Sequence, residues 1–545
     1  MRRITWLGAL AFAACSSSPA APDGAVASDG AAPADGRASD GGRADAAPSG
    51  AMAVGEFREL VADGQGAIAG QLPTAPGAEY LLVLTSSSRE ALKLYSYEVN
   101  AATAKPMQPA PPAPPLPAAP APRCDFARRL DEVLSTASGP MARKPSYKPF
   151  GSPPRKGDKR KFQLRGATGN QEIEAEAIWV DEVAVFWIDR TTQPAATIDE
   201  ATLKQLADGF AKVIVPRERI YFGQESDVNG DGHIAVLMSP LVTASAVAYV
   251  SPCDLVDPGK VAGCPTSNGL ELVYLSPPSS LQPPYNTAAA MLETIAHEFQ
   301  HAIYFYRKYL LNGTTDKKEN PYITEGLSGL AQDLSGYQAG NFYVVQATLA
   351  AIGEVAIPNV TSAELKSYVP GAGDGIMRGA GYLLLRYLFD QAGGDAMEAD
   401  GTPKDRGGIK WLRAYMDRPA LGDDNLDQSF PKGYEELVLQ FWTAMALSNR
   451  GTDGKPLSGD ARFNFLPTTK DPVTTRQRGC NLFTVFHGQQ LTGPKVQGVA
   501  AADGKLRAGG AELLRLEAGA DAKTLQVQLK VEPAAKARLR VVRVK

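Results

Sequence analysis

Short apolar runs mark strands in the first part of the central region. Apolar residues dominate residues 173–188 on both sides of Asp181 and Glu182, which predicts two strands joined at a bend. Two further runs, at 234–238 and 272–275, are apolar throughout and too short for stable helices. They predict buried strands.

Helical spacing takes over in the second part of this region. Apolar residues recur three or four positions apart over 203–214, behind Asp199, a residue type that favours the N-cap. Beyond residue 287 helices dominate, including 287–309, 382–390 and 434–447. Since strands come first and helices follow, the pattern predicts an α+β fold with a β-rich first part and a helical second part.

Two flanking segments have the pattern of strands. Residues 54–101 hold β-prone runs separated by proline and glycine, and residues 525–531 alternate strictly between apolar and polar types. We therefore expect two small β modules, at 54–101 and 481–545, one on each side of a main domain at 124–480. The core of that domain is expected at about 160–450.

The N-terminal residues have the pattern of an export signal. Positive charge at Arg2 and Arg3 precedes a short apolar run that ends in two alanines and Cys15. This ending resembles a bacterial lipobox, which implies a lipid on Cys15 and attachment to the cell envelope. An ordinary cleavage site, with secretion of the protein, is the alternative. Residues 16–53, poor in large apolar side chains, predict a disordered tether.

A second linker is expected at residues 102–123. Nine of the 17 residues from 106 to 122 are proline, which favours stiff polyproline II structure.

Composition limits the partners of the chain. The 56 Lys and Arg nearly balance the 59 Asp and Glu, for a formal net charge of −3 at pH 7. This balance argues against a nucleic-acid partner. No apolar run reaches about 18 residues, so membrane contact is expected only through the lipid on Cys15. We expect a monomer.

Export gives the cysteines beyond Cys15 an oxidising environment. Cys253 and Cys264 enclose a short loop, which makes their pairing the least costly in entropy and leaves Cys124 to pair with Cys480.

A metal-binding pattern lies in the predicted helix 287–309. His297 and His301 are four residues apart, so both imidazoles project from one helix face and can bind the same Zn²⁺. Glu298 beside them can hold a metal-activated water. The alternative is a pair of buried histidines whose ring nitrogens are hydrogen-bonded within the core. Random placement gives this motif in roughly one sequence in 700, so chance is a poor explanation for it. The histidines are expected to face a cleft while apolar residues anchor the helix, namely Ile295, Phe299, Ala302, Ile303 and Tyr306.

A catalytic zinc ion needs a third protein ligand. Metzincins continue their motif with a glycine and a histidine where this chain has Tyr304 and Arg307, which excludes that class. Glu325, near the start of a second predicted helix ending at about Leu334, can turn back onto the metal. Its alternative role is to complement the dipole of that helix.

The two motifs together resemble those of a known family. His297-Glu298-Phe299-Gln300-His301 followed by Glu325-Gly326-Leu327-Ser328 is similar to the hyicolysin-type neutral zinc metallopeptidases, which are gluzincin-like. The resemblance implies a zincin-like catalytic domain, zinc ligands at His297, His301 and Glu325, and Glu298 as general base. It covers roughly residues 170–395 and extends to 220–223, 227–232 and 379–388.

Two departures from the family pattern affect the rest of the site. Thr324 stands where the family usually has asparagine, and the family tyrosine near 378–380 is missing. Arg378 and Tyr382 are the candidates for stabilising the oxyanion. Asp333 is a candidate partner for a ligand histidine, although a solvated helix acid is the favoured interpretation.

A second possible ion site begins at Asp227. Asp227, Asn229 and Asp231 are spaced like the first ligands of a calcium loop, but the twelfth position is Met238. A hairpin turn without Ca²⁺ is therefore the favoured interpretation. His233 and His487 are expected to be ordinary polar histidines.

These observations lead to one prediction of function and one alternative. The predicted protein is an exported zinc endopeptidase that hydrolyses polypeptides, with Glu298 as the base. The alternative is a surface lipoprotein whose β modules bind glycan or protein and whose zinc domain is catalytically silent.

Overall fold

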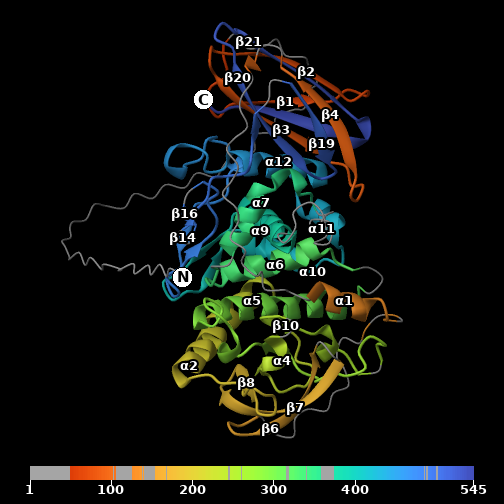
Figure 1. Cartoon of the computed structure of the whole chain (residues 1–545), viewed down its shortest axis with the longest axis vertical. Helices are drawn as coiled ribbons and strands as arrows, with labels where there is room; N and C mark the ends of the chain where they lie inside the picture. The colour runs from red at the N-terminus through yellow and green to blue at the C-terminus, as the bar shows by residue number, and fades with distance from the viewer. Residues whose placement is uncertain are drawn as a thin grey trace, which may run out of the picture. The chain divides into compact units, whose positions relative to one another are not determined.

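The computed structural model describes most of the chain after residue 49 (Figure 1). The predicted export signal with Cys15, most of the tether and the linker, Cys124 and His487 lie outside the described residues. Among the described residues, no helix has both the length and the apolar character needed to cross a membrane. The described residues, all within the unit Pro48–Lys545, are 50–101, 104–105, 126–137, 139, 141, 154–166, 169–243, 246–258, 260–314, 318–338, 341–357, 373–483, 485–486, 489–498 and 501–545.

The central region contains a six-stranded sheet with the order β10-β11-β9-β8-β7-β6. β8 is parallel to β9 and β9 to β11, whereas the other neighbours are antiparallel. β10 is therefore an antiparallel strand at one edge. The strands are β6 (Lys159–Gly166), β7 (Gly169–Val180), β8 (Ala184–Asp189), β9 (Ile234–Met238), β10 (Ala248–Val250) and β11 (Leu272–Leu275).

The strands predicted from apolar runs are confirmed. β7 and β8 form the expected pair, and the Asp181 carboxylate at their bend accepts hydrogen bonds from the backbone of Val183 and Ala184. β9 and β11 coincide with the runs at 234–238 and 272–275. At β9 and β11 both faces of the sheet are buried, which explains why these two runs lack polar positions.

Helices cover one face of the sheet. The long helix α5 (Ala288–Phe305) contacts β10, β11 and α2, and on its other side it contacts α6 (Figure 1). Asp199 caps α2 as predicted, because its carboxylate accepts the backbone N–H of Thr202. The other elements of this part are α1 (Phe126–Leu134), α2 (Glu200–Gly209), the π-helical turn η1 (Phe210–Ile214), α3 (Val215–Tyr221), α4 (Pro240–Thr243), η2 (Pro252–Leu255), η3 (Pro278–Ser280) and the π-helical turn η4 (Tyr306–Leu311).

The second part is helical, as predicted. α6 (Pro321–Leu334) packs between α5 and α9, and α7 packs on α9. The remaining helices and short strands here are α7 (Asn341–Ala350), η5 (Ile352–Glu354), α9 (Gly373–Gln391), β12 (Asp395–Met397), β13 (Pro403–Asp405), α10 (Gly408–Asp417), α11 (Gly422–Ser429), α12 (Gly433–Leu447), η6 (Thr452–Gly454), η7 (Ala461–Phe463), β14 (Thr469–Lys470), β15 (Gln477–Arg478), β16 (Val485–Phe486) and β17 (Gln489–Gln490). With helices at 36% and strands at 25%, the protein is of mixed α and β structure.

The two flanking β segments do not form separate modules. Strands from both alternate within two sheets, in the orders β1-β22-β3-β20-β18 and β19-β4-β21-β2, and β5, from the predicted linker, pairs with β20 (Figure 1). The strands are β1 (Phe57–Val61), β2 (Ala67–Pro73), β3 (Glu79–Ser86), β4 (Leu94–Asn100), β5 (Ala104–Lys105), β18 (Gln497–Gly498), β19 (Ala501–Arg507), β20 (Ala511–Ala518), β21 (Thr524–Val531) and β22 (Ala537–Arg543), with η8 (Pro533–Ala535) before the last.

The physical reason for this interleaving lies in the shared core of the two sheets. Leu82 and Leu84 of β3 are buried in the same apolar cluster as Val527 and Leu529 of β21. Each strand of the first segment pairs with strands of the second, so neither segment forms these sheets alone and the two ends of the chain complete one core.

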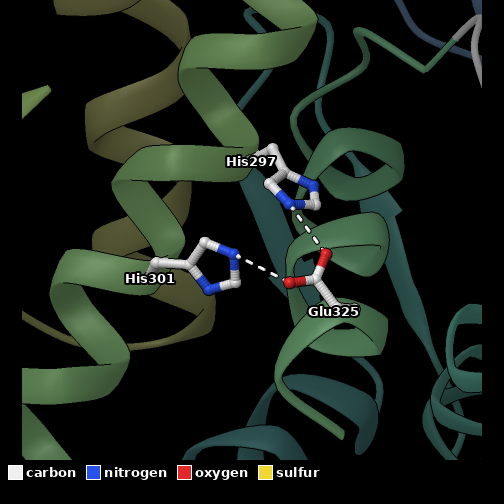
Figure 2. A group of neighbouring side chains, drawn as sticks. All are labelled: His297, His301 and Glu325. Atoms are coloured by element: carbon white, nitrogen blue, oxygen red, sulfur yellow. Dashed lines mark ion pairs between the residues drawn. The ribbon is translucent and has the colours of Figure 1, made fainter. Parts of the chain in front are cut away.

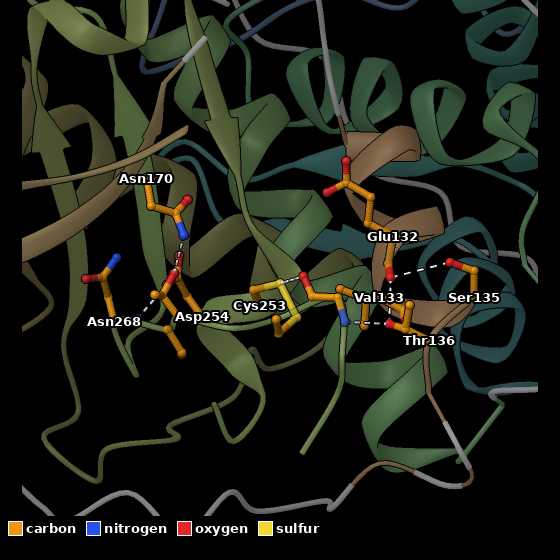
Figure 3. Close-up of a disulfide and its surroundings, with 12 residues drawn as sticks. Glu132, Val133, Ser135, Thr136, Asn170, Cys253, Asp254 and Asn268 are labelled. Carbon is orange, nitrogen blue, oxygen red and sulfur yellow. Dashed lines mark hydrogen bonds between the residues drawn. A yellow bond between two sulfur atoms is a disulfide. The ribbon is translucent and has the colours of Figure 1, made fainter. Parts of the chain in front are cut away.

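The cysteines agree with the prediction in one pair only. Cys253 and Cys264 form a disulfide (Figure 3). The predicted bond between Cys124 and Cys480 is wrong, because Cys480 is a free, buried thiol. It lies close to Asp333 and Arg386 in the helical part.

Candidate metal centre

α5 presents the motif histidines from a well-capped helix. Thr287 accepts the backbone N–H of Ala290 at its N-terminus, and the helix continues into η4, so the predicted helix 287–309 is confirmed. Its anchors Ile295 and Phe299 are fully buried in the core shared with the sheet. This packing fixes the helix face that carries His297 and His301.

α6 brings Glu325 to the two histidines. The Asn320 side chain caps this helix by accepting the backbone N–H of Tyr322, and Pro321 occupies the first turn. Glu325 then points at both imidazoles (Figure 2): its Oε2 lies 3.3 Å from Nε2 of His297, and its Oε1 lies 3.6 Å from Nε2 of His301.

The three side chains form a buried group that could hold a metal ion. One ligand atom from each lies within 4.8 Å of the other two. A tetrahedral ion with bonds of about 2.0–2.1 Å places neighbouring ligand atoms about 3.3–3.4 Å apart, and the two His–Glu contacts, one to each carboxylate oxygen, are 3.3 and 3.6 Å long. A charge-assisted hydrogen bond would instead be about 2.7–2.9 Å long. The spacing therefore suits ligands around an ion better than a His-Glu-His hydrogen-bonded trio.

Unsatisfied polar atoms at the centre support the same assignment. Within the described part of the chain, both ring nitrogens of His297 and the Oε2 atoms of Glu298 and Glu325 are buried without a hydrogen-bond partner. Buried polar groups left without partners destabilise a fold unless an ion or water satisfies them. The donor set of two imidazoles and a carboxylate thus fits a divalent cation.

Electrostatics keep the three ligands in their metal-binding forms. Burial lowers the pKa of His297 and, more strongly, that of His301, which favours neutral imidazoles. Burial would raise the pKa of Glu325, but the imidazoles and the Arg378 guanidinium outweigh it and hold that pKa below its usual value. Glu325 is therefore an ionised carboxylate.

Glu298 differs from Glu325 although both are buried. Burial and the negative charge of Glu325 raise the pKa of Glu298 to about 8, while Arg378 and Arg129 oppose the shift. A carboxyl group that titrates near neutral pH can both accept and return a proton.

Ser328 contacts His301, a contact that was not predicted from the sequence. Its Oγ lies 3.1 Å from Nδ1 of His301 and donates a 2.7 Å hydrogen bond to Oε1 of Gln300. The same oxygen lies 3.4 Å from Nε2 of His301, so Ser328 positions the imidazole ring without fixing which ring nitrogen carries the proton. The helical spacing of three residues from Glu325 was the signal that could have identified it.

Asp333 is neither a histidine partner nor a solvated acid. It is fully buried and accepts hydrogen bonds from the Tyr382 hydroxyl, at 2.9 Å, and from Arg386, at 3.0 Å. The backbone N–H of Gly479 also donates to it. The favoured interpretation is wrong because α9 and the chain around Gly479 cover this face of α6.

The contacts of Arg378 and Tyr382 distinguish the two candidates for oxyanion stabilisation. Arg378 lies beside the metal centre, with Nε 3.5 Å from Oε2 of Glu325. The Tyr382 hydroxyl is bound to Asp333, two helical turns beyond Glu325 on α6. The structure brings Arg378 into the site and leaves Tyr382 as a buried structural residue.

The metal centre does not face an open cleft. The side chains of His297, His301 and Glu325 are only 3%, 0% and 3% exposed. One cover is the ring of Phe126 in α1, which stacks on the His301 imidazole with centroids 4.1 Å apart. The contact joins residues far apart in sequence, so no local pattern could have predicted it.

The segment at Asp227 is a loop between α3 and β9, not a hairpin turn. Asn229 donates to the Asp231 carboxylate, and the Asp231 carboxylate accepts the backbone N–H of His233. Gly232 donates to Asp227, so the polar side chains stabilise the loop itself. His233 also contacts the Asp231 carbonyl through Nδ1, as expected for an ordinary polar histidine.

Comparison with known proteins adds no assignment to this geometry. No protein-family model matches the chain, and no curated protein is detectably similar to it. The interpretation of the site therefore depends on its residues.

Proposed function

We propose that this protein is an exported, zinc-dependent endopeptidase with a zincin-like catalytic domain, related to the hyicolysin-type metallopeptidases. The observation that carries the proposal is the convergence of His297, His301 and Glu325 at the ligand spacing of a tetrahedral ion, with Glu298 beside them. Two imidazoles with one carboxylate favour Zn²⁺ over Ca²⁺ or Mg²⁺, which prefer oxygen ligands alone.

The residues around this centre have different roles in peptide hydrolysis. When bound, the ion would supply Lewis-acid chemistry, activating a water molecule and polarising the scissile carbonyl. Glu298 takes the proton from the attacking water and returns it to the leaving amine. The Arg378 guanidinium, next to Glu325, stabilises negative charge that develops on the carbonyl oxygen.

A Glu298→Gln variant tests the proposal. It should keep one zinc ion per chain and lose about 10²- to 10⁴-fold in the cleavage of unfolded casein, since general acid–base catalysis contributes this much. Glu218→Gln is a matched control: Glu218 is fully buried on α3 and burial raises its pKa well above the usual value, so it is already neutral. Undiminished activity of Glu298→Gln would refute the role of the base.

Export and acylation at Cys15 are proposed from the sequence alone. The mass of the mature N-terminal peptide distinguishes a lipid-anchored protein from a secreted one. An unprocessed N-terminus would contradict both.

A second function is favoured by one observation, the burial of all three ligand side chains. In this alternative, the metal centre is structural and silent, and the protein is a surface lipoprotein that binds glycan or protein through its sandwich of β1–β5 and β18–β22. Stoichiometric zinc without turnover of any peptide in a proteome-derived pool would favour this alternative.

A further inference from the structure

α1 lies over the metal centre. Phe126, its first residue, is fully buried, and its ring stacks nearly parallel to the His301 imidazole at an interplanar angle of 7°. His297 lies against the same imidazole edge-on, at 4.9 Å between centroids. The face of His301 that Phe126 covers is therefore closed to any other molecule.

α1 also reaches the edge of the sheet next to the metal centre. The guanidinium of Arg129 stacks on the ring of Tyr249 in the edge strand β10, 3.7 Å from its centroid, and Arg129 is only 4% exposed. Its charge also acts on Glu298. α1 thus joins the two surfaces, β10 and the motif face of α5, that an extended peptide would have to contact to reach Glu298.

The disulfide loop holds the end of α1 (Figure 3). The backbone N–H of Gly263, next to Cys264, donates a 2.8 Å hydrogen bond to Oγ1 of Thr136, and that hydroxyl donates to the carbonyl of Glu132. A Cβ on Gly263 would lie 2.2 Å from the Glu132 carbonyl oxygen, so only glycine permits this approach. The hydrogen bond and the close backbone approach together fix the end of α1 against the disulfide loop.

The packing of α1 against β10 and the disulfide loop is incomplete. A cavity of about 290 Å³ lies between Arg129 and Glu132 of α1 and the residues Tyr249, Ser251 and Cys253. Asp131 of α1 forms an ion pair with Lys318, but both side chains are exposed to solvent, so the pair contributes little to holding α1 in place. Leu130 and Val133 of α1 are buried in the same core as α5, so α1 is held by this packing together with the stack on His301, the Arg129 contact and the loop around Gly263.

We propose that α1 is an intramolecular inhibitor that occupies the peptide-binding surface of the metal centre, so that the chain in this structure is a latent form. The inference depends on the proposed endopeptidase function for its purpose, but the occlusion itself is a property of the fold. The occupant that replaces α1 is an extended polypeptide substrate. Release of α1 exposes His301 and the side of the centre next to β10.

Accessibility of the histidines tests the occlusion without metal or catalysis. Diethyl pyrocarbonate modifies exposed imidazoles, and mass spectrometry reports the rate at each histidine of the metal-free full chain. In Phe126→Ala, His301 should react at least fivefold faster than in the wild type. His233, whose side chain is 15% exposed, is the internal reference and should not change.

A matched variant separates release of α1 from general loosening. Phe162 is a fully buried ring in a different apolar cluster, on the other face of the sheet, so Phe162→Ala should leave the rate at His301 unchanged. A change of less than fivefold in Phe126→Ala, or an equal change in Phe162→Ala, overturns the proposal.

Thr136→Val keeps the proposal testable if Phe126→Ala does not fold. This variant is nearly isosteric at an exposed position and removes the hydroxyl that accepts from Gly263 and donates to the carbonyls of Glu132 and Val133 within α1. The rate at His301 should rise at least twofold, and an unchanged rate in a folded Thr136→Val protein counts against α1 as the inhibitor.

Zinc release to a chelator and casein cleavage complete the experiment. Both should be at least fivefold faster in zinc-loaded Phe126→Ala. Faster modification and faster zinc release without any cleavage would leave the occlusion standing and refute the peptidase. Equal cleavage by wild type and variant, with His301 equally protected in both, would refute the inhibitor and leave the peptidase standing.

Discussion

Gly326 of α6 and Gly381 of α9 touch through their backbones where the two helices cross. A Cβ on Gly326 would lie 2.5 Å from the carbonyl carbon of Gly381, a distance that real side chains do not adopt. The close crossing places Arg378, three residues before Gly381, next to Glu325, the neighbour of Gly326. The geometry of the candidate metal centre therefore depends on two residues without side chains.

Gly326→Ala should displace α9 from α6. We expect a loss of about 1–3 kcal/mol in unfolding free energy, as for other overpacked sites, and weaker zinc binding. Gly375→Ala in α9 is the control, because its Cβ would meet nothing closer than 3.9 Å and should be neutral or stabilising by about 0.4–1 kcal/mol. Denaturation and zinc titration of both variants measure this, and native-like values for Gly326→Ala would contradict the close crossing.

Arg378→Ala should bind zinc more tightly and turn over more slowly. Removing the guanidinium beside Glu325 removes repulsion of a divalent cation, for which we expect about a tenfold gain in affinity. The same change should lower kcat by about 10²- to 10³-fold, because one oxyanion donor is lost. Competition with a chromophoric chelator and casein cleavage measure the two effects, which must occur together.

Tyr382→Phe is the matched comparison for Arg378→Ala. Its hydroxyl is bound to Asp333, so the variant should lose about 1–2 kcal/mol of stability while kcat and zinc affinity stay within about twofold. A large drop in kcat with unchanged stability would instead make Tyr382 the oxyanion donor.

Ser328→Ala should weaken zinc binding by about 10- to 100-fold, because partners that orient metal-binding histidines typically contribute this much. Without the hydroxyl, the His301 ring loses its contacts with Ser328 Oγ, which lies 3.1 Å from Nδ1 and 3.4 Å from Nε2. Ser239→Ala is the control: this buried serine directly follows β9 and donates to Asp189 at the end of β8. Zinc affinities from competition with a chelator distinguish the two variants. Equal affinities would contradict a role of Ser328 in zinc binding.

Removal of metal should destabilise the protein. Zinc at about 1,000 times its dissociation constant should add about 4 kcal/mol to the unfolding free energy, and EDTA should abolish this gain. His297→Ala should show no difference between zinc and EDTA, whereas His233→Ala should behave like the wild type. Thermal unfolding with each additive provides the measurement, and a melting temperature indifferent to zinc would mean that the triad holds no ion.

Glu512 should make stability depend on pH. Burial and the charge of Glu354 raise its pKa to about 7, while Lys495 opposes the shift. Because the folded-state pKa lies above the unfolded value of about 4.3, the stability from Glu512 is fully present below about pH 4 and is lost as pH rises through 7. Relative to Glu512→Gln, the wild type should lose about 1–3 kcal/mol between pH 5 and pH 8.

Denaturation at several pH values gives this difference. Glu435→Gln, a change at an exposed residue of α12, is the control and should follow the wild type at every pH. Parallel curves for wild type and Glu512→Gln would contradict the raised pKa.

Local patterns were enough for the elements and part of the site. The apolar run at 234–238 became β9, and the carboxylate of Asp199 caps α2 as expected. The spacing of His297 and His301 placed both on one face of α5, and the short loop favoured the Cys253–Cys264 bond. These features depend on residues close in sequence, where helix and strand geometry fixes which side chains share a face.

Long-range contacts were decided only by the tertiary structure. The pattern showed that β3 and β21 each have an apolar face, but not that both ends of the chain share one core. Nor did it show that Asp333 is buried beneath α9, or that Phe126 covers His301. Periodicity identifies the face of an element that avoids water. Which surface covers that face depends on the packing of the whole chain, since hydrophobic attraction has no direction of its own.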